Sequence, residues 1–176
     1  MLYETHRPRV LRLAYSLIGD SDEAEDVMQE VMIYALKNLD RYDPARSAFT
    51  TWLHTITVSR ARDQQRRRRS ALQRLGDWWG NHGSPDSGDP DAEVVLDRLD
   101  AESRVGRALQ QLTPLQREAL VLREVEELSF AEIGQILSVP LRTAQARVTG
   151  AYAALRKQLQ PAAPTTLEVT HEQPHR

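Results

Sequence analysis

Arginine side chains gather at two places in this 176-residue chain, and both places suit the binding of phosphate. The segment SRARDQQRRRRS at residues 59–70 holds six arginines, four of them consecutive. A second group, Arg142 and Arg147, is interleaved with hydroxyl and amide side chains. A guanidinium group is always charged and can donate two parallel hydrogen bonds to one phosphate. Both segments are therefore candidate nucleic-acid contacts, while a solvated helix end is the alternative for the first.

The second group is predicted to lie on the reading helix of a helix-turn-helix. Two amphipathic segments, of about eight and about sixteen residues, flank the turn SVP at residues 138–140. In such a motif the second helix enters the major groove of DNA with its first residues at the base edges. Arginine can pair with guanine and glutamine with adenine, whereas threonine and arginine also hold phosphates. The outward residues expected to contact DNA are Arg142, Thr143, Gln145, Ala146, Arg147 and Thr149.

The residues before and within the arginine cluster predict three amphipathic helices. The first covers residues 9–18 and ends at Gly19, since glycine commonly follows the last helical residue. The second starts at Asp20 or Ser21, either of which can cap it. The loop DRYDPARS at residues 40–47 separates it from a third helix that continues into the arginines. The residues expected to face the core are Val10, Leu13, Ala14 and Leu17, then Ala24, Val27, Met28, Val31, Ala35 and Leu36, and finally Phe49, Trp52, Leu53 and Ile56.

A second helical unit is predicted after residue 90, with two of its helix starts marked by capping side chains. Its first helix begins near residue 91 and reaches about residue 112. The segments TPLQ and SFAE, at 113–116 and 129–132, are capping boxes that start the next two helices. The last helix is expected over residues 141–158, with Ala144, Val148, Tyr152 and Leu155 facing inward.

The formal net charge of −2 hides an uneven distribution along the chain. Residues 1–75 hold 13 basic and 10 acidic side chains, residues 77–102 hold one and eight, and residues 104–160 hold eight and five. Local charge, not the sum, decides whether a segment attracts nucleic acid. The segment GNHGSPDSGDP is too poor in apolar residues to offset its chain entropy. The expected fold is therefore all-α: a helical domain at 1–69, a flexible acidic linker at 70–90, a helix-turn-helix domain at 91–160 and a disordered tail at 161–176.

Several functional classes are disfavoured by what the sequence lacks. With no cysteine, the chain can form no disulfide, thiolate metal site or cysteine nucleophile. We find no glycine-rich phosphate loop and no metal-ligand spacing among the five histidines, so we expect no enzyme activity, metal or cofactor. No apolar run is long enough to span a membrane and the N-terminus carries no export signal, so we expect a cytoplasmic protein.

Two long segments resemble the two promoter-reading domains of bacterial sigma factors. Residues 108–157, from ALQQLTPLQREAL to AYAALRK, resemble the domain that reads the −35 element. Residues 23–69 resemble the domain that reads the −10 element, with the motifs AEDVMQEV, DRYDP and an F-x-x-W-L pattern at 49–53. Their order and the short connection between them resemble the extracytoplasmic-function (ECF) group of the sigma-70 family. The resemblance implies a non-catalytic subunit that binds core RNA polymerase, directs it to promoters and helps to open the −10 region.

The resemblance also assigns residues to partners. The loop and the start of the third helix would catch unstacked bases of the −10 element, and the arginine cluster would hold phosphates beside them. The polar face of the second helix would dock on the clamp coiled coil of the polymerase. The residues implied are Tyr42, Arg46, Ser47, Thr50, Thr51, His54, Arg60, Arg62, Arg66 and Arg67 for promoter DNA, and Asp26, Gln29, Glu30 and Lys37 for polymerase. An anti-sigma protein is implied as a control partner.

The reading helix departs from the pattern common in the family. Gln145, Ala146, Thr149 and Gly150 stand where lysine, serine, histidine and a second arginine are frequent. Fewer cations weaken nonspecific phosphate binding, so the preferred −35 sequence is expected to differ. Ser138 stands where the turn often has glycine, which requires an uncommon backbone angle or some strain.

One alternative function remains open at this level. A stand-alone helix-turn-helix regulator would bind DNA through its C-terminal domain without polymerase. A sigma factor must instead span two elements roughly 50 Å apart, about one and a half duplex turns. A 21-residue flexible linker has a relaxed span of roughly 25 Å, so a scaffold such as polymerase would have to hold the domains apart.

Overall fold

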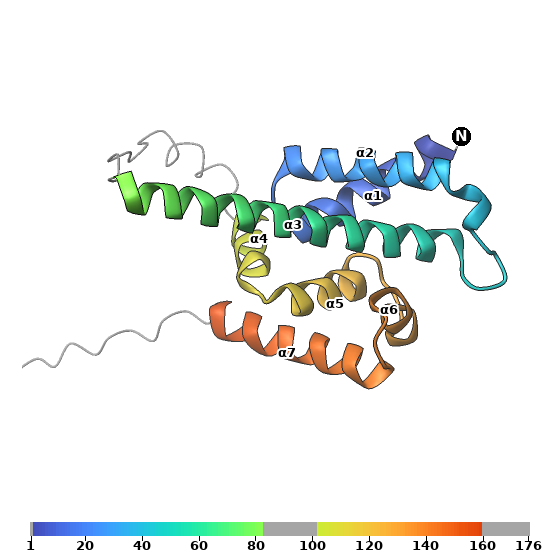
Figure 1. Cartoon of the computed structure of the whole chain (residues 1–176). Coiled ribbons are helices and arrows are strands. Elements are labelled where there is room, and N and C mark those ends of the chain that lie inside the picture. The colour runs from blue at the N-terminus through green and yellow to red at the C-terminus, as the bar shows by residue number, and fades with distance from the viewer. Residues whose placement is uncertain (1, 83–101, 160–176) are drawn as a thin grey trace, which may run out of the picture.

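The computed structural model describes residues 2–82 and 102–159, and within them every regular element is a helix. Figure 1 shows three layers, with helices α1 and α2 on one side, the long helix α3 across the middle and helices α4 to α7 on the other side. The all-α fold expected from the sequence is confirmed for this part of the chain.

The N-terminal layers contain α1 (Leu2–Ile18), α2 (Ser21–Lys37), a short 3₁₀ turn (Leu39–Arg41) and α3 (Phe49–His82). Gly19 ends α1 in the left-handed conformation, with a φ of 82°, and its N–H donates to the Tyr15 carbonyl at 2.8 Å. Asp20 then caps α2 by accepting a hydrogen bond from the Glu23 N–H at 2.9 Å. The two residues between α1 and α2 therefore reverse the chain and start the next helix.

Two helices are longer than the sequence predicted. Helix α1 begins at Leu2 and includes Pro8, so it starts before the expected residue 9. Helix α3 continues to His82, through the first part of the segment expected to be a linker. The rest of that linker, the expected helical residues 91–101 and the tail from residue 160 lie outside the described residues. The side chains of Trp78 and Trp79 lie outside them as well.

The C-terminal layer contains α4 (Glu102–Gln111), α5 (Pro114–Glu124), α6 (Phe130–Leu137) and α7 (Leu141–Leu159). Both predicted capping boxes are present, with Thr113 and Ser129 as the N-cap residues. In each box the cap oxygen accepts from the backbone of the third helical residue, and that residue's side chain accepts from the cap N–H.

The predicted inward faces are confirmed with two exceptions. The first three helices bury Val10, Leu13, Ala14, Leu17, Ala24, Val27, Met28, Val31, Ala35, Leu53 and Ile56, and α7 buries Ala144 and Val148. Phe49, Trp52 and Leu155 are partly buried against this core. The prediction is wrong for Leu36, which is 55% exposed on α2, and for Tyr152, which is 45% exposed on α7. The Tyr152 hydroxyl reaches back to donate to Glu124 Oε1 at 2.5 Å, and Met32 is buried on α2.

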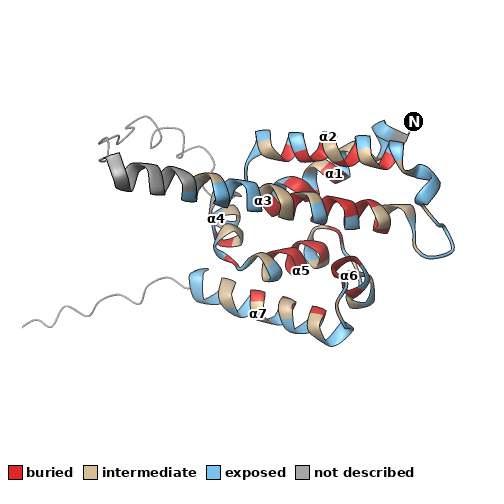
Figure 2. Cartoon of the chain, in the orientation of Figure 1, coloured by how far each residue is buried: buried red, intermediate tan, exposed pale blue. Residues whose placement is uncertain are grey.

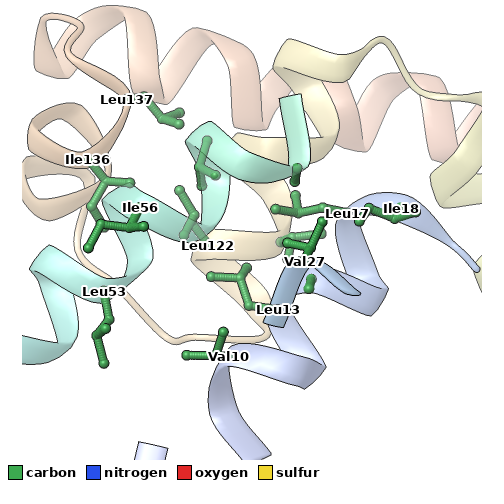
Figure 3. Close-up of a cluster of buried hydrophobic side chains, with 14 of the residues drawn as sticks. Val10, Leu13, Leu17, Ile18, Val27, Leu53, Ile56, Leu122, Ile136 and Leu137 are labelled. Atoms are coloured by element: carbon green, nitrogen blue, oxygen red, sulfur yellow. The ribbon is translucent and has the colours of Figure 1, made fainter. Parts of the chain in front are cut away.

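One hydrophobic core joins the N-terminal and C-terminal layers. Figure 2 shows buried residues on both sides of α3, and Figure 3 shows Ile56 of α3 beside Ile136 of α6. Helix α3 packs on α6, and α1 packs on both α4 and α5. The sequence predicts two helical domains joined by a flexible linker, and in this structure apolar surfaces of the two are buried against each other. Periodicity shows that a face is apolar but not which partner covers it.

The turn between α6 and α7 holds a residue in an unfavourable conformation. Ser138 has a φ of 54° and caps the end of α6. The left-handed region disfavours residues with a Cβ, and glycine removes that cost while losing more entropy on folding.

We expect Ser138→Gly to raise the free energy of unfolding by about 0.5 kcal/mol, measured by urea denaturation. Ser138→Ala is the matched control, because it shortens the side chain but keeps the Cβ, and it should give no gain. Equal stability changes in the two variants would contradict this account.

Candidate nucleic-acid and polymerase interfaces

The solvent-facing side of α7 carries most of the residues predicted to read DNA. Arg142, Gln145, Ala146 and Thr149 are all exposed, and their spacing places them on one face of the helix. Thr143 and Arg147 lie at the edges of this face and are half-buried. The structure therefore brings all six predicted residues together around one helical surface.

This face is held outward by the opposite side of α7 and by the preceding turn. Ala144, Val148 and Ala151 are buried against the rest of the domain. In the turn, the Val139 N–H donates to the Gly134 carbonyl at 2.9 Å. A Cβ at Gly134 would lie 2.8 Å from the Val139 carbonyl oxygen, so the glycine allows the turn to fold closely onto α6. These contacts give the helix-turn-helix its fixed angle.

The arginine cluster forms a mostly exposed surface on α3. The side chains of Arg66, Arg67 and Arg68 are 75%, 61% and 54% exposed. Arg67 lies 3.4 Å from Glu30 and Arg68 lies 3.8 Å from Glu23, both on α2, and Arg66 pairs with Asp63. Exposed pairs of this kind contribute little stability and exchange readily for other anions. The cations are thus accessible to a nucleic-acid backbone.

Aromatic rings cluster where the loop after α2 meets the start of α3. The Tyr42 ring centroid lies 5.1 Å from that of Phe49 and 5.5 Å from that of Trp52. The Tyr42 hydroxyl donates to the Ser47 carbonyl at 3.1 Å, which fixes the loop over the rings. Tyr42 is half-buried, so one side of this cluster is open to solvent.

The remaining residues predicted to contact the −10 element differ in exposure. Arg46 is exposed, and Thr50 and Arg60 are half-buried, with the Arg60 guanidinium 5.2 Å from the centre of the Tyr34 ring. Thr51 and His54 are only 5% and 1% exposed. In this arrangement neither side chain is open to solvent, and the His54 Nε2 lies 3.1 Å from Glu126 Oε2 of the C-terminal layer. Their contact with the −10 element stays a prediction.

The outward face of α2 combines polar and apolar side chains. Asp26, Gln29 and Lys37 are exposed as expected, whereas Glu30 is only half-exposed and points toward Arg67. The exposed apolar part of this face was not predicted from the sequence: Ile33, Leu36 and Leu39 are 53%, 55% and 42% exposed. Ile33 and Leu39 lie off the main apolar stripe, and this spacing is the sequence signal from which their exposure could have been predicted. Exposed apolar side chains near one another commonly mark a surface that binds another protein.

A buried carboxylate, Glu126, lies where the C-terminal layer meets the N-terminal layers. Its side chain has 0% exposure, and its Oε2 lies 2.7 Å from Arg9 Nε and 3.1 Å from His54 Nε2. Its Oε1 accepts from Arg12 at 3.2 Å. Burial alone would raise the pKa of Glu126, but His54, Arg9 and Arg12 outweigh it and the net pKa is lowered.

A second pair of charged groups crosses the same boundary. Arg62 donates from Nε and Nη2 to the two oxygens of Glu118, both at 2.7 Å. These hydrogen bonds outweigh burial and raise the pKa of Arg62.

Arg117 of α5 is buried and donates to the Leu17 carbonyl at the end of α1, at 2.9 Å. Burial and the charge of Arg69 lower the pKa of Arg117.

The helix-turn-helix with a polar outward face places the chain among the DNA-binding proteins of that class. Known protein families make the assignment specific: residues 2–71 match the family model "Sigma-70 region 2" and residues 102–155 match "Sigma-70, region 4". The chain is 30% identical to the ECF RNA polymerase sigma factor SigW of Bacillus subtilis, over 90% of this chain and 87% of that protein. It is 34% identical to the RNA polymerase sigma factor CarQ of Myxococcus xanthus, over 90% and 87%.

A solved structure shares the fold. The sigma factor RpoE from Bartonella quintana, in its co-crystal structure with the anti-sigma factor NepR, has a TM-score of 0.69 to this chain. The identity is 24%, with 92% of this chain and 96% of that chain covered.

The chain belongs to the ECF RNA polymerase sigma factors. Such a protein binds core RNA polymerase and gives it promoter specificity, so the alternative of a regulator acting without polymerase is wrong. Family membership makes the chain a transcription initiation factor. None of the described helices is both long and apolar enough to cross a membrane. The described acidic and histidine side chains form no group that could hold a metal ion.

The lowered pKa of Glu126 predicts a particular dependence of stability on pH. A carboxylate with a depressed pKa contributes stability above its ordinary value of 4.5, and this stability is lost as pH falls through the lowered value. We expect Glu126→Gln to reduce the free energy of unfolding by about 2 kcal/mol at pH 7, measured by urea denaturation. The difference from wild type should shrink below about pH 4.

The neighbouring Glu127→Gln is the control, because Glu127 is exposed. It should change stability little at either pH. A difference between wild type and Glu126→Gln that stays constant from pH 7 to pH 3 would contradict the assignment.

Proposed function

We propose that α7 reads the −35 promoter element through Arg142, Gln145, Ala146 and Thr149, with Thr143 and Arg147 on flanking phosphates. The observation that carries this proposal is the exposure of these four side chains on one face of the second helix of a helix-turn-helix. Arg142 and Gln145 have the donors and acceptors for paired hydrogen bonds to guanine and adenine. Ala146 and the Thr149 methyl group suit contact with a thymine methyl.

The −10 element is bound by the arginine surface of α3 and by the aromatic loop before it. Arg66 and Arg67 are exposed and hold only weak pairs, so they are available to phosphates. Tyr42 offers an accessible ring on which an unstacked base can stack. The binding surface is completed by residues of this loop and of the adjoining part of α3, namely Arg46, Ser47, Thr50 and Arg60.

The polymerase is bound by the outward face of α2. Ile33, Leu36 and Leu39 supply apolar area, and Asp26, Gln29, Glu30 and Lys37 supply polar contacts around it. Apolar groups at the centre and charged groups at the edge are the usual arrangement of a protein interface. Promoter DNA and core polymerase are both found in the cytoplasm, so the protein acts there.

An anti-sigma protein is a further partner. RpoE of Bartonella quintana was solved with the anti-sigma factor NepR, and CnrH was solved with the cytosolic domain of CnrY. Their fold is shared by this chain, which supports a similar form of control here.

We expect Gln145→Ala to relax base preference at a single −35 position by about tenfold or more. The measurement is transcription by core polymerase with this protein on a promoter library randomised in both elements. Preference within the −10 element should not change, because that element is read by other residues. Gln158→Ala, an exposed change at the far end of α7, serves as the control. An unchanged −35 preference would show that Gln145 does not read DNA.

We expect Ile33→Gln to weaken binding to core polymerase about tenfold, because it removes apolar area from the interface. Binding can be measured by fluorescence anisotropy of the labelled sigma factor. Val105→Gln on α4 is a matched control, since Val105 and Ile33 are each 53% exposed. Both variants should retain the wild-type free energy of unfolding. Equal affinities for polymerase in the two variants would place the binding face elsewhere.

A further inference from the structure

Two glutamates of the C-terminal layer have their side-chain partners in the N-terminal layers. Glu118 of α5 is held by Arg62 of α3. Glu126, just after α5, is held by Arg9 and Arg12 of α1, and its carboxylate lies beside His54 of α3. Both side chains are nearly or fully buried, with exposures of 6% and 0%. Burying a carboxylate costs free energy unless charged or hydrogen-bonding partners surround it. The packed arrangement supplies such partners to both glutamates.

The side chains that hold these glutamates overlap with the proposed DNA surface. Arg62 belongs to the arginine cluster of α3, and His54 lies on the same helix before it. The fork of Arg62 meets both oxygens of Glu118 in the parallel geometry that a guanidinium also uses for a phosphate. The glutamate therefore occupies the donors that a phosphate would need.

Other residues of the −10 surface are covered in the same arrangement. Thr51 and His54, which the family resemblance assigns to the −10 element, are buried. His54 lies against Glu126 of the C-terminal layer, and Gln135 of α6 donates to the Arg46 carbonyl at 3.2 Å. By contrast, Ile33 and Leu36 of α2 remain exposed, and Figure 1 shows α2 across α3 from that layer. The closed chain therefore presents its proposed polymerase face while it covers part of its −10 surface.

From these contacts we infer that Arg9, Arg12, His54 and Arg62 form a docking surface for the carboxylates of the chain's own C-terminal domain, and that promoter DNA binding requires Glu118 and Glu126 to leave it. The inference rests on the proposed role of α3 at the −10 element. The two promoter elements lie roughly 50 Å apart, whereas the two layers share one core here, so this arrangement cannot bind both elements. Opening is thus a step in activation.

The test compares two double variants of the full-length chain. Glu118→Gln/Glu126→Gln removes the two buried charges. Glu124→Gln/Glu127→Gln removes two exposed charges from the same domain, so it controls for a general change in electrostatic attraction to DNA. Circular dichroism should show the same helix content in both variants and in wild type.

Closure is measured directly as a distance between spin labels. The chain has no natural cysteine, so Glu25→Cys on α2 and Ala153→Cys on α7, both exposed positions, give two unique labelling sites. We expect one narrow distance distribution for wild type and for the exposed-charge control. The buried-charge variant should show a broader distribution that extends to longer distances. A broad distribution in wild type, or no change in the variant, would overturn the inference.

Occlusion is measured as affinity for DNA without polymerase. The probe is a fork-junction DNA with the −10 sequence that the promoter library selects. We expect the buried-charge variant to bind it at least tenfold more tightly than wild type, and the control to bind it nearly as wild type does. No gain in affinity, or an equal gain in the control, would show that the glutamates do not compete with DNA.

A charge exchange tests the pair between Arg62 and Glu118 separately from DNA binding. Arg62→Glu should lengthen the spin-label distances, and Arg62→Glu/Glu118→Arg should restore the narrow wild-type distribution. Failure to restore it would overturn the role of this pair. Transcription by wild type with core polymerase is an independent readout, so its failure would count against the proposed function and not against closure.

Discussion

A buried carboxylate links the two halves of this sigma factor, because its partners all come from the half to which it does not belong. Glu126 has no exposed side-chain surface, and it is stable as an anion only because Arg9, Arg12 and His54 surround it. Removing a charge from water costs several kcal/mol, which such partners must offset. These partners come from α1 and α3, so the packing that buries the charge also brings it the groups that offset the loss of water.

The same packing separates two kinds of surface. The face of α7 proposed to read DNA and the apolar face of α2 point outward, because the opposite sides of both helices are buried in the core. Helix α3 differs, since it lies between the layers and is covered along its first half. Its later arginines remain open to solvent, whereas Arg62 is tied to Glu118. Because a sigma factor uses its promoter-binding and polymerase-binding surfaces together, the inferred opening of the two halves would make all of the proposed surfaces available at once.

Much of the local structure followed from short-range chemistry. The capping boxes at Thr113 and Ser129, the helix end at Gly19 and the left-handed Ser138 all depend on a few neighbouring residues, and each is where the sequence placed it. The outward face of α7 was predictable for the same reason, because helical periodicity alone separates Gln145 from Val148. The errors had a different origin. Leu36 and Tyr152 fit an apolar stripe by type, but a stripe can be wider than the surface that covers it.

The sequence by itself determined the helices, their caps, the helix-turn-helix and the family to which the chain belongs, since all of these are encoded in residue types at fixed spacings. Only the tertiary structure decided which surfaces meet. That α3 lies between the layers, that Arg62 finds Glu118 and that Glu126 is enclosed by α1 and α3 could not be read from periodicity. Such contacts join residues more than fifty positions apart, and their formation depends on shape and charge at a distance along the chain. Local propensity carries no information about them.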